Sequence, residues 1–286
     1  MRISVITACW NSGPTLADAL ESVAGQRLCA GDSVEHLVID GGSTDSTPEL
    51  LRAFSERHPP TAAYSFAYVS EKDRGMYDAI NKGIARATGD VVGILNADDA
   101  FDGGDALARV SRAFSSAGDG SAPEALYGDV RFVRPVAGES FVASDRTVRY
   151  YSARHWKPWM LQWGFMPPHP SLYVRREHFA RLGDYRLGYD IAADYELIVR
   201  YLRKAGLRSK YLPGSLVKMR LGGKSTSSWR SNLTLNLENV RANRENGYFS
   251  MLPMMLPKYA FKIWEFILPR LGLSAPRGAD AADGRG

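Results

Sequence analysis

The sequence predicts an α/β protein with a mostly parallel central sheet flanked by helices, and three observations support this prediction. Short apolar runs alternate with helical patterns three times before residue 91. Strand–helix alternation of this kind is typical of right-handed parallel units. A fourth apolar run, 91–95, has no polar alternation, as expected for a strand covered on both faces. With 286 residues and 45% apolar content, the chain is long enough to bury such a core.

The elements of the first hundred residues follow from apolar spacing and from helix start and stop signals. Pro14 suits the first position of a helix, and Thr47-Pro48-Glu49 is a typical helix start. A later helix ends at Thr88-Gly89, and we expect four of its apolar residues to be buried on one face: Met76, Ile80, Ile84 and Ala87. The expected elements are strand 3–7, helix 16–24, strand 34–39, a helix from 47, strand 67–69, helix 76–87 and strand 91–95.

The rest of the sequence predicts further strands and helices, followed by a C-terminal extension. Gly128-Asp129 interrupts an expected strand, and Gly206 closes a helix. The expected elements are helix 106–114, strand 126–133, strand 172–174, helix 176–182, a helix before 206, strand 216–221 and a long helix over 227–246. The segment 248–273 is apolar and interrupted by prolines, with Lys258 and Lys262 on one helical face. It resembles an interfacial helix at an anionic membrane, although packing against the domain would explain the same pattern. We expect 274–286 to be a disordered tail.

Composition limits the classes of function and the compartment. The net charge of +5 suits an anionic ligand or an anionic membrane surface. No nucleic-acid-binding module is recognisable, so we expect no nucleic-acid partner. Cys9 and Cys29 are too few for a disulfide framework, and the chain enters a strand at Ile3 without a signal-peptide pattern. We therefore expect reduced thiols in a cytoplasmic protein, with peripheral contact to the inner face of the plasma membrane.

Two carboxylates follow the fourth expected strand, in the run Asn96-Ala97-Asp98-Asp99. In open α/β sheets, ligands lie outside the carboxyl ends of the strands. Adjacent carboxylates repel each other unless a cation or hydrogen bonds compensate them. One interpretation is a Mg²⁺ or Mn²⁺ site presented to a phosphorylated ligand. The other is an Asp-rich helix cap.

Other polar residues follow neighbouring strands. Asp40 ends the second strand, where it could accept a hydrogen bond from a ribose or base or could only stabilise its own turn. Asp73 and Arg74 follow the third strand on the same rim. Further along, His169 is a candidate ligand for a metal or diphosphate or a structural residue between prolines. Asp194 is expected at a helix start, as a general base or as an N-terminal cap.

Two further segments are candidates for contacts with a sugar or a diphosphate. Residues 150–168 are rich in Tyr and Trp, and aromatic faces of this kind stack on sugar rings or fill a core under a long loop. Gly222-Gly223 is flanked by cations, as in a mobile loop over a diphosphate or in a simple surface turn.

Three motifs in this order resemble the family 2 glycosyltransferases with the nucleotide-sugar-binding GT-A fold. They are ISVITACWN, VIDGGSTDST and NKGIARATGDVVGILNADD, within a resemblance that covers about 1–223. The family's metal motif is usually Asp-x-Asp, so Asn96 departs from it and leaves the metal to Asp98 and Asp99. Ala193 stands where the family has Glu, and Asp194 matches the position of its catalytic base. An arginine often precedes the asparagine of the third motif, and here Ile80 does.

The resemblance implies a glycosyltransferase domain over 1–225, with a nucleotide-binding half (1–100) and an acceptor half (101–225), followed by a helical extension (226–273). It implies that Asp194 is catalytic and that Mg²⁺ or Mn²⁺ is the cofactor. The implied donor site consists of Thr7, Ala8, Asp40, Asp73, Arg74, Asn96 and Asp98. The implied metal site consists of Asp98 and Asp99, with His169 as a further candidate.

The implied activity is inverting transfer of a sugar from a nucleoside-diphosphate sugar, with UDP as the favoured base. The sugar would be transferred to a hydroxyl group of a lipid-linked or oligosaccharide acceptor in cell-surface polysaccharide synthesis.

Two other classes of function stay open. A sugar-phosphate nucleotidyltransferase would use the same carboxylates but needs a cationic loop near Asn11, which Asn11-Ser12-Gly13 lacks. A non-catalytic carbohydrate-binding module would not need Asp98, Asp99 and Asp194.

Overall fold

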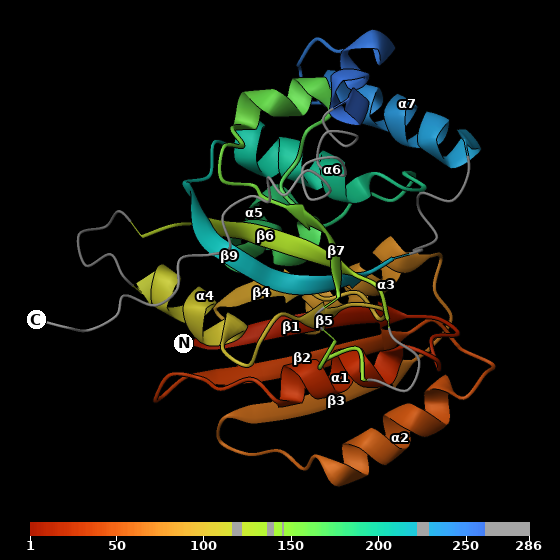
Figure 1. The fold of residues 1–286 in the computed structure, drawn as a ribbon, viewed down its shortest axis with the longest axis vertical. Helices are drawn as coiled ribbons and strands as arrows, with labels where there is room; N and C mark the ends of the chain where they lie inside the picture. Colours follow the sequence, from red (N-terminus) through yellow and green to blue (C-terminus); the bar gives the residue numbers. More distant parts are fainter. Residues whose placement is uncertain (116–121, 136–139, 145, 222–228, 261–286) are drawn as a thin grey trace, which may run out of the picture.

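The computed structural model describes residues 1–115, 122–135, 140–144, 146–221 and 229–260. Within them, one sheet runs through the molecule in the order β3-β2-β1-β4-β8-β6-β9-β5, and β7 pairs with β6 (Figure 1). The strands are β1 (Arg2–Cys9), β2 (Ser33–Asp40), β3 (Tyr64–Ser70), β4 (Val91–Ile94), β5 (Ala100–Phe101), β6 (Ala125–Val133), β7 (Thr147–Tyr151), β8 (Tyr173–Arg175) and β9 (Ser209–Arg220). The helices are α1 (Leu16–Ala24), α2 (Thr47–Arg57), α3 (Met76–Arg86), α4 (Ala106–Ser115), α5 (Glu177–Leu182), α6 (Ala193–Ile198) and α7 (Trp229–Glu245). Shorter helical turns are η1 (Pro158–Trp163), η2 (His169–Ser171), η3 (Val199–Lys204) and η5 (Leu252–Met255).

The N-terminal half is the predicted parallel α/β unit. Strands β1 to β4 are parallel to their neighbours within this half. Successive residues of β1 point to opposite faces, as the period of a strand requires. Val5 packs with Ala19 and Val23 of α1, whereas Ile6 packs with Ile80 of α3. The helices therefore cover both faces of these strands, which explains why β4 is apolar throughout.

Beyond β4 antiparallel strands join the sheet, although the expected parallel pairing holds across β1 to β4 and again between β6 and β9. Strand β8 runs antiparallel to both β4 and β6, and β7 also runs antiparallel to β6. Strand β6 is parallel to β9, with register shifts on either side of Asp129. The predicted interruption at Gly128-Asp129 is thus confirmed. Local apolar patterns do not encode the direction in which distant strands pair, so the antiparallel pairings of β5, β7 and β8 were not predicted.

Three local expectations differ from the structure. Helix α1 begins at Leu16 rather than at Pro14. Met76 is 48% exposed, because it is the first residue of α3 and lies before the helix reaches the core. The first part of the C-terminal segment packs on the domain: Met255 is fully buried, and Tyr259 accepts a hydrogen bond from Asn236 of α7.

The remaining expectations for the C-terminal segment lie outside the described residues. They concern the Gly222-Gly223 loop, the apolar run from Phe261 and the tail over 274–286. None of the helices in the described part of the chain is long and apolar enough to cross a membrane.

Candidate active site

The predicted donor residues lie at one edge of the sheet, where the parallel strands β1 to β4 end. We call the loops 10–15, 41–46, 71–75 and 95–99 the carboxyl rim. Ala8, Asp73, Asn96 and Asp98 are partly buried at or beside this rim. These residues therefore lie at the strand ends where the sequence predicted them.

Thr7 and Asp40 are fully buried and support the rim from inside. The Thr7 hydroxyl lies 3.1 Å from Nε2 of His36 in the core. The Asp40 carboxylate accepts hydrogen bonds from the hydroxyls of Ser43 and Ser70, each at 2.5 Å, and from the Ser43 backbone N–H. These contacts match the turn role that was one of the two interpretations of Asp40.

Asp73 and Gly41 are in close contact across the rim. A Cβ at position 41 would lie 2.4 Å from Oδ2 of Asp73, so only glycine leaves room for this carboxylate. Oδ1 of Asp73 accepts a hydrogen bond from the N–H of Gly75 at 2.8 Å. Arg74 instead pairs with Asp78 of α3 at 2.7 Å, and its side chain is largely exposed. Asp73 is thus the better placed of the two for a ligand.

The carboxylates of Asp98 and Asp99 have different surroundings. Asp99 is buried, and its oxygens accept hydrogen bonds from the Asn96 amide (2.8 Å) and the Arg220 backbone N–H (3.1 Å). Burial and the charge of Asp98 raise the pKa of Asp99 well above that of an ordinary aspartate. Among the residues that the structure describes, none donates a hydrogen bond to the Asp98 carboxylate.

Arg220, the last residue of β9, contacts both the loop after β4 and helix α1. Its Nε donates to the backbone carbonyl of Asp98 at 3.3 Å, and its guanidinium pairs with Asp18 at 2.9 Å. The guanidinium also lies over the Phe141 ring, 4.1 Å from its centre. The Arg220 guanidinium thus pairs with Asp18 rather than with the side chains of Asp98 and Asp99.

The chemistry of these donors fits a divalent cation. Magnesium is usually held by one or two carboxylates together with substrate phosphates. Asp98 is the available ligand, whereas both Asp99 oxygens already accept hydrogen bonds. No group of three His, Cys, Asp or Glu side chains within the described ranges could hold a metal. A phosphorylated ligand would therefore have to complete the coordination.

Asp194 lies in the first turn of α6, and three groups surround its carboxylate. Nδ1 of His169 is 3.2 Å from Oδ2. Oδ1 accepts hydrogen bonds from the Tyr195 backbone N–H (2.8 Å) and the Tyr77 hydroxyl (3.4 Å), and that hydroxyl also donates to the Ile191 carbonyl. Tyr77 is the second residue of α3 and follows Asp73 by four positions, so Asp194 lies beside the carboxyl rim. His169 contacts Asp194, which the proposal of a metal ligand did not anticipate.

Helix α6 is fixed by a carboxylate from α7. Both oxygens of Glu238 accept hydrogen bonds from the consecutive backbone N–H groups of residues 190, 191 and 192, at 2.7 to 3.0 Å. Two residues after Asp194, the fully buried Glu196 pairs with Arg200 at 2.9 Å and accepts a hydrogen bond from Asn246 at 3.1 Å. The position of Asp194 therefore depends on residues that follow it by 40 positions or more.

Sequence reasoning missed two aromatic residues of the site. Trp10 follows β1 at the carboxyl rim and is 57% exposed. Tyr77 was hidden inside a helical pattern. The position of Trp10 directly after a buried strand was a signal that could have identified it.

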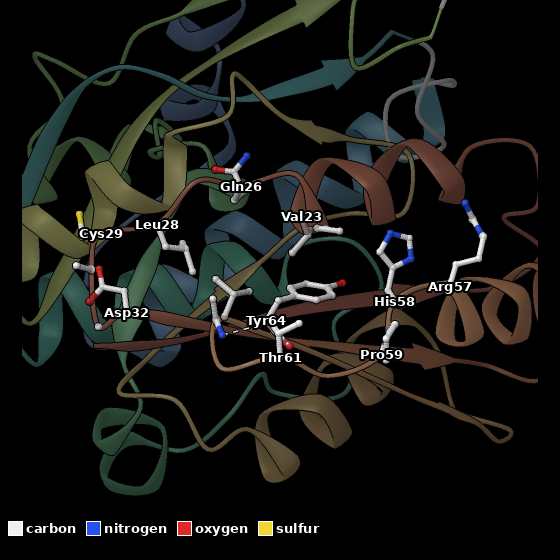
Figure 2. Close-up of a pocket in the computed structure, with 15 residues that line it drawn as sticks. Val23, Gln26, Leu28, Cys29, Asp32, Arg57, His58, Pro59, Thr61 and Tyr64 are labelled. Atoms are coloured by element: carbon white, nitrogen blue, oxygen red, sulfur yellow. Dashed lines mark hydrogen bonds between the residues drawn. The ribbon is translucent and has the colours of Figure 1, made fainter.

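The pocket in Figure 2, with a volume of about 590 Å³, lies at the opposite end of the strands. Leu28, His58 and Tyr64 are among the residues that line it, near the C-terminal ends of α1 and α2. Its lining includes none of the predicted site residues. We assign the site to the carboxyl rim because the carboxylates lie there.

The chain also resembles known proteins in sequence. Residues 4–178 match the family described as "Glycosyl transferase family 2", and this match ends before Asp194. The chain is 33% identical over 205 residues to the "Uncharacterized glycosyltransferase Rv1514c" of Mycobacterium tuberculosis, covering 69% of this chain and 68% of that protein. It is 29% identical over 209 residues to the "PGL/p-HBAD biosynthesis glycosyltransferase Rv2957" of the same organism, covering 73% of each.

Solved structures share the fold. The S. aureus TarS fragment 1–349 in complex with UDP-GlcNAc has a TM-score of 0.56 at 14% identity, covering 96% of this chain and 74% of that one. The mannosyltransferase PcManGT from Pyrobaculum calidifontis, in complex with GDP-Man and Mn²⁺, has a TM-score of 0.54 at 20% identity, covering 95% and 77%. Together with the sequence match and the carboxyl rim, these likenesses identify the chain as a member of the family 2 glycosyltransferases with the GT-A fold.

Proposed function

We propose that the protein is an inverting glycosyltransferase that moves a sugar from a nucleoside-diphosphate sugar to a hydroxyl group of a lipid-linked or polysaccharide acceptor. The observation that carries this proposal is the position of Asp194 beside the carboxyl rim, where Tyr77 joins α6 to the loop of Asp73. A carboxylate there is suited to act on a group that approaches a donor bound at the rim.

The donor would lie along the rim with its nucleoside near Trp10, Ala8 and Asp73. The exposed Trp10 ring offers an apolar face to a base, and the Asp73 carboxylate offers an acceptor to a base N–H or a ribose hydroxyl. Asp40 would support this surface from below. The bound complexes of TarS with UDP-GlcNAc and of PcManGT with GDP-Man support a nucleotide sugar as the donor class. We favour UDP as the base.

The diphosphate would lie at Asp98, with Asp99 and Asn96 behind it. A Mg²⁺ or Mn²⁺ ion held there would stabilise the negative charge on the departing diphosphate. The Mn²⁺ in the PcManGT complex supports this metal class. This chain would contribute Asp98 as a metal ligand and would hold Asp99 in place through hydrogen bonds from Asn96 and Arg220.

Transfer would then need one proton acceptor. Asp194 would take the proton of the acceptor hydroxyl as its oxygen attacks the anomeric carbon opposite the diphosphate. The new C–O bond forms as the bond to the phosphate oxygen breaks, which inverts the anomeric centre and releases the nucleoside diphosphate. General-base assistance of this kind contributes roughly 10²- to 10⁴-fold to the rate.

The acceptor class and the place of action rest on two observations. The similarity to a PGL/p-HBAD biosynthesis glycosyltransferase supports a glycolipid or cell-surface glycan. The neighbouring turns η1 and η5 and the residues on either side of η5 expose large apolar side chains, among them Trp159, Phe249 and Leu256. Such a surface is suited to contact a membrane that holds a lipid-linked acceptor. We propose peripheral contact with the inner face of the plasma membrane.

The test is a panel of UDP- and GDP-sugars with Mn²⁺, with and without a chelator, and with octyl glycosides as acceptors. We expect nucleoside diphosphate to be released from one donor class, with loss of release in chelator. NMR of the product should show the anomeric configuration opposite to that of the donor. Retention of configuration would refute the inverting mechanism, and no metal-dependent release from any donor would refute the proposed donor class.

A further inference from the structure

We propose that His169 is a positioning residue for Asp194, which it holds through Nδ1 in the orientation needed for proton transfer. This inference rests on the proposed function, because it assigns a partner to the proposed base. Its observation is the contact of 3.2 Å between Nδ1 of His169 and Oδ2 of Asp194.

The two oxygens of Asp194 are held from different sides. Oδ1 has the backbone N–H of Tyr195 and the hydroxyl of Tyr77. Among the described residues, Oδ2 accepts no hydrogen bond and lies at ion-pair distance from Nδ1 of His169. Without that imidazole, only the contacts of Oδ1 restrain the terminal torsion of the carboxylate, which is broad for Asp.

His169 stands on a rigid backbone. It lies between Pro168 and Pro170, whose rings fix their own φ angles, and it begins the turn η2. The buried hydroxyl of Ser171 lies 2.8 Å from the carbonyl oxygens of Pro168 and Gly128, which attaches this turn to β6. The imidazole is therefore presented from a fixed support, whereas Asp194 comes from a separate helix.

The His169–Asp194 pair is mostly buried but remains partly accessible to solvent. The side chains of His169 and Asp194 are 21% and 16% exposed, so part of each remains accessible to an acceptor. Nε2 of His169 has no hydrogen-bond partner within the described part of the chain. The geometry thus leaves two candidates for the atom that takes the proton, Asp194 and Nε2 of His169, and the experiment must separate them.

Substitutions of His169 separate the roles of its two nitrogens. His169→Asn places an amide N–H close to the position of Nδ1 but has no counterpart of Nε2. His169→Ala removes both. If His169 positions Asp194, His169→Ala should lower kcat roughly 10- to 100-fold, since a misplaced catalytic group costs up to about 10² in rate. His169→Asn should recover kcat to within about 3-fold of the parent, and the KM of the nucleotide sugar should stay unchanged in both variants.

The assay measures release of nucleoside diphosphate from the UDP- or GDP-sugar on which the full-length parent is active. In an Asp194→Asn background, His169→Ala should cause no further loss, because a positioning residue acts only through its partner. His58→Ala and His58→Asn are matched controls at the far end of the strands, where neither kcat nor KM should change.

Each other outcome overturns the inference in a distinct way. Equal and severe loss in His169→Asn and His169→Ala would make Nε2 the proton acceptor. Parental kcat in both variants would leave His169 a structural residue. A parent that releases nucleoside diphosphate from no donor would refute the proposed function and, with it, the role assigned to His169.

Discussion

Replacing Asp98 with asparagine should raise the stability of the fold and weaken metal-dependent binding of the donor. The Asp98 carboxylate receives no hydrogen bond from the described residues, and its charge helps to raise the pKa of the buried Asp99. Removing that charge relieves repulsion between the two groups. The free energy of unfolding should therefore rise by roughly 0.5–2 kcal/mol, the usual gain from correcting an unfavourable charge.

The same substitution should weaken metal-dependent donor binding. Changing a residue that only supports a metal ligand costs about 10- to 100-fold in metal affinity or activity. Asp98→Asn removes a proposed ligand, so Mn²⁺-dependent affinity for the nucleotide sugar should fall by at least ~100-fold, the upper end of that range.

Two measurements on the same variant test this reasoning. Thermal unfolding in chelator should give a melting temperature raised by a few degrees, because 1 kcal/mol corresponds to about 2–4 °C for a chain of this size class. Calorimetric titration with the donor should show the loss of affinity when Mn²⁺ is present.

Asn96→Ala is a matched comparison. It removes a hydrogen bond to Asp99 but no proposed metal ligand, so it should lower stability. Parental donor affinity in Asp98→Asn would refute the role of Asp98 in binding the metal, and a lower melting temperature would refute the electrostatic argument.

Three further predictions concern the base, the core and the membrane. Asp194→Asn keeps the shape of the side chain, so donor affinity should stay within a few-fold of the parent while kcat falls by at least ~10²-fold; near-parental kcat would remove Asp194 from the mechanism. Burial lowers the pKa of His36 from 6.5 to about 3, so the unfolded state alone binds a proton as the pH falls below 6.5. The contribution of His36 to the free energy of unfolding is therefore fully present above that pH and decreases towards pH 3, by about 2 kcal/mol at pH 5. Denaturant unfolding at pH 7 and pH 5 should show this loss in the parent but not in His36→Leu. Finally, the full-length chain should sediment with anionic liposomes at low salt, where lysines contribute about 1 kcal/mol each, and a variant with Trp159, Phe249 and Leu256 replaced by serine should not; parent protein that stays in the supernatant would contradict membrane contact.

The sequence predicted the strand ends and the carboxylates of the proposed donor site because both are local patterns. The apolar run before Asp98 and the glycines after Asp40 are short-range signals, and they pointed to the carboxyl ends of β1 to β4. The contact of His169 with Asp194 spans 25 residues, and the two belong to separate elements. No periodicity connects such residues, so the sequence left each with two roles. For Asp40, the sequence could not show that Ser43 and Ser70 would occupy its oxygens, since Ser70 comes from another strand.

The direction of strand pairing was also beyond the sequence. Strand β8 has three residues, too few for an apolar pattern to show whether it runs with β4 or against it. Met255 was assigned to a segment that could contact a membrane, yet it is fully buried against the domain. An apolar side chain looks the same in a sequence whether lipid or protein covers it.

The contacts of Glu238 set a practical limit on how this enzyme can be recombined with its relatives. A chimera that joins the first 221 residues to another C-terminal segment would leave three consecutive amides before α6 without their acceptor. Ala192 is fully buried, and a buried donor that loses its partner costs about 1–3 kcal/mol. The loss falls on the helix that carries Asp194. An exchange of acceptor specificity should therefore keep α6 and α7 together as one transferable unit.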